Sequence, residues 1–123
     1  MTTFGYAIVF VFDMDRSVAF YRDTLGLPLK FQSPEWSEFA TPSTTLALHK
    51  AGPKNAADDR AELHAGTCQL GFSVPSLDAF HAEMTAHGIP CLQPPAIQNF
   101  GAKLAKYADP DGLPFSVSEA QAQ

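Results

Sequence analysis

The sequence predicts an α+β fold made of two successive βαβββ modules, and three observations support this prediction. Segments rich in β-branched and aromatic residues lie at 6–13 and 69–76, and each is typical of a strand that ends at a helix cap. Apolar residues then recur at helical spacing in both halves of the chain. Each helical segment stops at a glycine followed two residues later by proline, which is typical of a left-handed C-terminal cap. The two halves therefore repeat one structural unit.

The first module is expected to span about residues 4–50. Its first strand ends at Asp13, and the helix that follows has an apolar face made of Met14, Val18, Tyr21 and Leu25. Proline and serine turns divide the rest of the module into short strands. They predict three strands, at about 29–33, 36–41 and 45–50.

The second module is expected at about residues 67–118, after a linker at about 51–66 that should contain one helical turn. Its helix has Leu77, Phe80 and Met84 on one face. Strands should follow at about 91–93, 102–108 and 114–118, and the turn Asp109-Pro110-Asp111-Gly112 joins the last two. Both modules are expected to form a single domain of residues 1–123.

Length, composition and charge exclude several classes of protein. With 123 residues, 46% of them hydrophobic and 17% charged, the chain can bury one core, so it is neither disordered nor two independent domains. A net charge of −5 leaves no basic stripe for nucleic acid or an anionic membrane surface. The apolar run at 7–12 is far shorter than the roughly 20 residues of a membrane span. We therefore expect a cytoplasmic protein with no nucleic-acid or membrane partner.

The cysteines and most histidines are predicted to have no chemical role. Cys68 and Cys91 fit no zinc-binding spacing and are expected to be free, buried thiols. His64 lies in the linker, and His81 and His87 lie on or just after the second helix, where solvated positions are expected. The sequence also lacks a Ser-His-Asp order, a phosphate-binding loop and a dinucleotide-binding glycine pattern, so no candidate nucleophile emerges.

Three motifs, and the order in which they follow one another along the chain, resemble those of the vicinal oxygen chelate superfamily. The superfamily includes glyoxalase I, bleomycin-resistance proteins, fosfomycin-resistance transferases and extradiol dioxygenases, and the resemblance covers about residues 4–118. It rests on Asp13-Met14-Asp15-Arg16-Ser17, on Phe20-Tyr21-Arg22-Asp23-Thr24-Leu25-Gly26, and on Asp109-Pro110-Asp111-Gly112. It implies two βαβββ modules whose strands curl into a half-barrel around a cleft, usually in a homodimer. It does not imply a particular reaction, because one fold hosts many functions.

The enzymatic members of this superfamily hold a divalent metal through His, Gln or Glu in the cleft. The resemblance carries their ligand positions onto Tyr6, Ala47, Gln69 and Ser116. Only Gln69 keeps a suitable side chain, whereas a catalytic site needs about three protein ligands. His49 should lie on the same strand face as Ala47, which leaves a Gln69–His49 pair open. We expect no bound metal and no cofactor.

Strand alternation then assigns side chains to the cleft or to the helix side. In the first strand the residues that should face the helix are Ala7, Val9 and Val11. In the second module they are Leu70, Phe72 and Val74. Lys103 and Lys106 should lie on opposite faces of their strand. The candidate ligand-binding residues are Tyr6, Ile8, Phe10, Trp36, Glu38, Ala47, His49, Gln69, Gly71, Ser73, Ser116 and Ser118.

Three functional hypotheses remain open from the sequence. The first is a metal-free binding protein of the bleomycin-resistance type, a homodimer that sequesters an aromatic or cationic drug-like molecule. The second is an enzyme, either a glyoxalase-like lyase or isomerase with an unusual metal set, or one that uses Glu38 as a general base. Glu38 could instead be a solvated residue of an edge strand. The third hypothesis is a structural or regulatory module whose cleft its own side chains fill.

Overall fold

The computed structural model describes residues 6–51, 68–98 and 101–119. The chain divides into two compact units, Met1–Asp58 and Asp59–Gln123, and each is described by itself. The linker predicted at about 51–66, with its helical turn and His64, lies outside the described residues except for Ala51.

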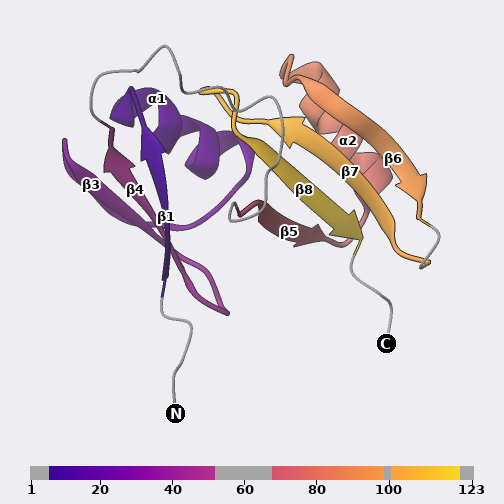
Figure 1. Cartoon of the computed structure of the whole chain (residues 1–123), viewed down its shortest axis with the longest axis horizontal. Helices are drawn as coiled ribbons and strands as arrows, with labels where there is room; N and C mark the ends of the chain where they lie inside the picture. Colours follow the sequence, from indigo (N-terminus) through magenta and orange to yellow (C-terminus); the bar gives the residue numbers. More distant parts are fainter. Residues whose placement is uncertain (1–5, 52–67, 99–100, 120–123) are drawn as a thin grey trace. The chain divides into compact units, whose positions relative to one another are not determined.

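The first unit contains one four-stranded sheet and one helical segment (Figure 1). Its strands are β1 (Tyr6–Val11), β2 (Leu29–Gln32), β3 (Trp36–Ala40) and β4 (Thr45–Lys50). The helical segment comprises α1 (Met14–Ala19) and a π-helical turn, η1 (Phe20–Thr24). The strand order is β1-β4-β3-β2; β1 runs parallel to β4, and the other pairs are antiparallel.

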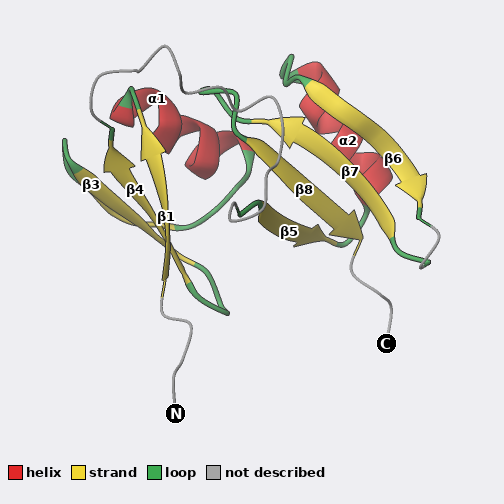
Figure 2. Cartoon of the chain, in the orientation of Figure 1, coloured by secondary structure: helices red, strands yellow, loops and turns green. Residues whose placement is uncertain are grey.

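The second unit repeats this arrangement. Figure 2 marks its helix in red and its strands in yellow. Its elements are β5 (Leu70–Val74), α2 (Leu77–Ala86), β6 (Cys91–Ile97), β7 (Lys103–Ala108) and β8 (Pro114–Glu119). The strand order β5-β8-β7-β6, with β5 parallel to β8, matches the order in the first unit. The predicted α+β class and the tandem βαβββ modules are confirmed. The single domain, the half-barrel and its cleft concern both units together and stay predictions.

The helix ends have the caps that the sequence predicts. Asp13 accepts a hydrogen bond from the Arg16 backbone N–H at 3.1 Å, and Ser76 accepts one from the Ala79 N–H at 3.2 Å. Such bonds satisfy backbone donors that have no partner within the helix. At the other ends, Gly26 and Gly88 have φ values of +77° and +70°, where a side chain would be strained.

The first helix differs from the prediction, because it does not remain α-helical as far as Leu25. From Phe20 it widens into a π-helical turn, in which the Leu25 N–H donates to the Phe20 carbonyl at 3.0 Å. The adjacent residues Phe20 and Tyr21 are both buried, and their ring centroids are 5.1 Å apart. The wider turn accommodates two successive aromatic rings in the core, which regular spacing does not reveal.

Strand β6 is longer than the predicted 91–93 and continues through Pro94 and Pro95 to Ile97. A proline cannot donate to a neighbouring strand, so it is tolerated mainly at a sheet edge. The strand order places β6 at such an edge, and its pairing with β7 shifts register on both sides of Gln93. The sheet position therefore explains why the two prolines do not end the strand.

Each unit has its core between the sheet and its helical segment. In the first unit Val11, Phe39 and Leu48 are fully buried together with Tyr21. In the second unit the fully buried residues include Leu77, Met84, Tyr107, Phe115 and Val117. The apolar helix positions predicted from spacing, Leu77 and Met84 among them, therefore contact the sheets.

Two predictions about single side chains are wrong. His81 is half-buried on α2 rather than solvated, and its Nδ1 lies 2.9 Å from the hydroxyl of the buried Tyr107. Cys68 and Cys91 are free but exposed, not buried. Cys91 begins the edge strand β6, and Cys68 precedes the other edge strand, β5, so neither lies beneath a neighbouring strand. His87 is exposed, as predicted.

Among the described residues, the longest helix is α2 with 10 residues, and none is long and apolar enough to cross a membrane.

The buried Tyr107 predicts a loss of stability at high pH. Burial, and secondly the negative charge of the nearby Cys91 sulfur, raises the pKa of Tyr107 to about 12 from the ordinary value of 10.0. As the pH rises from 10 to about 12, the unfolded chain releases this proton while the folded chain retains it, so stability falls. Urea unfolding should show this fall in the wild type and a smaller one in Tyr107→Phe. Tyr6→Phe, which changes an exposed tyrosine, should keep the wild-type slope; equal slopes in all three proteins would contradict the prediction.

A candidate ligand-binding face on the first sheet

The first sheet has one face covered by the helical segment and one aromatic face on the opposite side. In β1, Val9 and Val11 are buried, as predicted for the helix side. The alternate residues Tyr6, Ile8 and Phe10 are 60%, 38% and 55% exposed. Large apolar side chains are seldom left in such a row without a binding role. We call this side of the sheet the aromatic face.

Strand register extends the aromatic face from β1 across β4 to β3. Phe10 pairs with His49, and His49 pairs with Trp36, so these three side chains share the face. The His49 ring centroid lies 5.3 Å from that of Phe10 and 5.8 Å from that of Trp36. Ala47, between Ile8 and Glu38, is fully buried. All seven candidate residues of the first module thus lie together: Tyr6, Ile8, Phe10, Trp36, Glu38, Ala47 and His49.

Glu38 is held in place by two neighbours on the aromatic face. The Trp36 indole N–H donates to Glu38 Oε2 at 2.8 Å, and Lys30 Nζ lies 3.8 Å from Oε1. The side chain of Glu38 is 22% exposed, and β3 lies inside the sheet. The alternative of a solvated edge-strand residue is therefore wrong. The carboxylate fixes the orientation of the indole ring.

Two residues of the aromatic face were missed from the sequence, Lys30 and Phe31. Alternation would place Phe31 on the same side as Leu29, which pairs with the buried Phe39. The register shifts between Leu29 and Phe31, so Phe31 pairs with Glu38 instead and is 43% exposed. A bulge of this kind reverses the side to which a side chain points. The sequence signal that could have found Phe31 is its place beside the cationic Lys30 in an edge strand.

The candidate residues of the second module share the face of their own sheet that lies opposite α2. Gly71 pairs with Ser116 and Ser73 with Ser118, and the two hydroxyl oxygens of the latter pair are 3.5 Å apart. A Cβ atom added at Gly71 would lie 3.4 Å from Ser116 Oγ, which is an ordinary van der Waals contact. Gln69 is half-buried just before β5. This face is small and hydroxyl-rich, as predicted.

The two lysines of β7 lie on opposite faces, as the spacing predicts. Lys103 Nζ contacts Asp78 Oδ1 on α2 at 2.9 Å, which places it on the helix side, and this contact raises the pKa of Lys103. Lys106 pairs with Ser116 and therefore belongs to the hydroxyl-rich face. That face thus carries one ammonium group beside its serines.

The side chains at the superfamily's metal-ligand positions do not fit a metal. Ala47 has no donor atom, Tyr6 is a neutral phenol, and Ser116 Oγ donates to the Leu70 carbonyl at 3.4 Å. Of the four positions, Gln69 is the one that keeps a side chain suited to bind a metal. Nor do any three His, Cys, Asp or Glu side chains within 6–51, 68–98 and 101–119 come together as a metal site. The alternative of a Gln69–His49 pair would need one ligand from each unit, and the description of each unit by itself does not test it.

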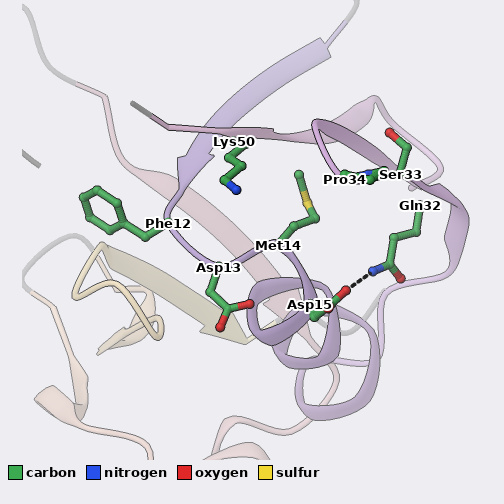
Figure 3. Close-up of a pocket in the computed structure, with 8 residues that line it drawn as sticks. All are labelled: Phe12, Asp13, Met14, Asp15, Gln32, Ser33, Pro34 and Lys50. Carbon is green, nitrogen blue, oxygen red and sulfur yellow. Dashed lines mark hydrogen bonds between the residues drawn. The ribbon is translucent and has the colours of Figure 1, made fainter. Parts of the chain in front are cut away.

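A separate cavity of about 650 Å³ lies where β1 ends and α1 begins (Figure 3). Asp15 accepts a hydrogen bond from the Gln32 amide at 2.8 Å across its rim, and Asp13 is engaged as the helix cap. The sequence did not predict this cavity, because its walls come from three segments distant in sequence. They are Phe12, Asp13, Met14, Asp15, Gln32, Ser33, Pro34 and Lys50.

The fold agrees with comparisons to known proteins. A family model described as the Glyoxalase/Bleomycin resistance protein/Dioxygenase superfamily matches residues 3–117. The chain belongs to this superfamily. No curated protein matches it.

Solved structures with the same fold cover nearly the whole chain. A protein of unknown function from Agrobacterium tumefaciens str. C58 is 26% identical, with a TM-score of 0.79 over 98% of this chain and 96% of that one. Lactoylglutathione lyase from Agrobacterium tumefaciens is 20% identical, with a TM-score of 0.71 and coverage of 98% and 95%. TioX from Micromonospora sp. ML1 is 16% identical, with a TM-score of 0.73 and coverage of 98% and 100%. The last two similarities show the fold alone.

The Trp36–Glu38 hydrogen bond predicts how the indole ring moves. Glu38→Ala removes the acceptor, so the time-resolved fluorescence anisotropy of Trp36, the chain's one tryptophan, should gain a faster component. Glu38→Gln keeps an oxygen that accepts the N–H, so it should resemble the wild type. Loss of this hydrogen bond in Glu38→Ala should also lower the free energy of unfolding by about 1 kcal/mol. If the anisotropy decay of Glu38→Ala is identical to that of the wild type, the hydrogen bond does not hold the ring.

Proposed function

We propose that this protein binds a small aromatic or cationic organic molecule on the aromatic face and acts by sequestering it, as a bleomycin-resistance-type protein would. The observation that carries the proposal is the in-register row of Phe10, His49 and Trp36, flanked by exposed Tyr6 and Ile8. When a flat ring stacks on such a row, its apolar surface is removed from water, and this burial supplies most of the affinity.

Superfamily membership supports a ligand-binding role, since bleomycin resistance is one of the activities in its description. The donor set at the metal positions favours binding over metal-dependent lyase chemistry, because Ala47 and Ser116 replace ligands that such chemistry requires. Sequestration needs no reacting group and requires only that the ligand be held.

We also propose that a second copy of the chain completes the binding cleft. The resemblance to the superfamily, whose members are usually homodimers, supports this part of the proposal. Sedimentation of the full chain should give a dimer whose proportion rises with concentration. If the chain stays monomeric and still binds ligand, the proposed dimer is wrong, whereas the proposed binding on the aromatic face still holds.

Ligand titration of the full chain tests the proposal. Proflavine, a planar cation, and bleomycin should each raise the melting temperature, and proflavine should quench Trp36 fluorescence to saturation. Phe10→Ala removes one stacking ring and should weaken proflavine binding roughly tenfold. Phe12→Ala is the matched control, because Phe12 lines the separate cavity and should leave the affinity unchanged.

Several results would overturn the binding proposal. One is that neither compound binds. Another is that Phe12→Ala weakens binding while Phe10→Ala does not, which would move the ligand to the cavity. The last is that the purified protein contains stoichiometric Zn, Ni, Mn or Fe and forms lactoylglutathione, and that a chelator stops this activity. That result would show a metal-dependent glyoxalase-like lyase.

A further inference from the structure

The polar character of the aromatic face depends on which ring nitrogen of His49 carries the proton. Its Nδ1 lies 2.7 Å from the backbone carbonyl oxygen of Lys50. A carbonyl oxygen can only accept a hydrogen bond, so Nδ1 carries the ring proton. In the neutral imidazole the other nitrogen, Nε2, then holds a lone pair and acts only as an acceptor.

Nε2 has no partner within the part of the chain that the structure describes. The ring lies between Phe10 and Trp36, and Nδ1 makes the histidine's one hydrogen bond. Both neighbours are aromatic and offer Nε2 no hydrogen bond, because the Trp36 indole N–H is already directed to Glu38. An acceptor flanked by rings is partly shielded from water, and a hydrogen bond made there is stronger than one in bulk solvent.

The carboxylate of the aromatic face is already engaged, in contrast to His49. Glu38 accepts the indole N–H through Oε2, and Lys30 lies near Oε1. A ligand cation would have to compete with Lys30 for this carboxylate. The hydroxyl group of Tyr6 can donate as well as accept, so it does not select for one kind of ligand group. Nε2 of His49 selects for a donor.

We infer that His49 is the specificity-determining residue of this face and that the ligand is a planar aromatic molecule with a hydroxyl or N–H donor at its ring edge. The ligand ring stacks beside Phe10 and Trp36, and its donor points to Nε2. This inference rests on the proposed function and narrows it from any aromatic or cationic compound to phenols and related donors. Glu38 acts as a positioning residue, because it fixes the indole ring against which the ligand packs.

Paired probes test the inference without knowledge of the natural ligand. Calorimetric titration of the full chain should show that 2-naphthol binds about five- to tenfold more tightly than 2-methoxynaphthalene, which has the same ring system and no donor. His49→Phe keeps an aromatic ring in the row but removes the acceptor, so both compounds should bind it with similar affinity. Glu38→Gln, which still accepts the indole N–H, should keep the preference. His87→Phe changes an exposed histidine of the second unit and should bind as the wild type does.

The outcomes separate this inference from the proposed function. If the two probes bind the wild type equally, the inference is overturned and the binding face stands. If His49→Phe keeps the preference for 2-naphthol, the acceptor is not His49 and the inference is again wrong. If neither probe nor proflavine binds, the proposed function itself has failed. A nitrogen NMR signal of His49 Nε2 that shifts with 2-naphthol and not with its methyl ether supports the inference directly.

Discussion

The pairing of β1 with β4 and of β4 with β3 is the constraint on which the candidate site depends. Side chains that lie opposite one another in paired strands share a face, so register decides which residues meet. Here it brings Phe10, His49 and Trp36 into one row while Val11 and Leu48 face the helical segment. A slip of one residue would exchange the two faces and bury the aromatic rings under the helix.

On the aromatic face, the polar groups differ in whether other groups of the protein already occupy their hydrogen-bonding atoms. Glu38 and Trp36 satisfy one another, and Lys30 approaches the same carboxylate. His49 uses one nitrogen on the Lys50 backbone, and its other nitrogen has no partner among the described residues. The face therefore combines rigid aromatic surface with one directional acceptor, as small-molecule sites commonly do. The second unit offers hydroxyl groups instead, on Ser116, Ser118 and Ser73.

Sequence analysis succeeded where the cause of a structure is local. The caps at Asp13 and Ser76 and the glycine ends of both helices depend only on residues a few positions away. Alternation in β1 likewise followed from neighbouring residues. It failed at Phe31, because the bulge that turns this ring toward Glu38 arises from pairing with another strand. The π-helical turn at Phe20 and the continuation of β6 through its prolines depend in the same way on burial and sheet position.

The sequence by itself determined the repeated βαβββ order and the residues that alternate toward each face. These follow from residue type and spacing, which are properties of a single segment. The tertiary structure alone decided that the Trp36 indole binds Glu38 and that His49 lies between two rings with Nδ1 bound to the backbone. The ring contacts of His49 join three strands, and a hydrogen bond depends on distances and angles that no sequence pattern specifies.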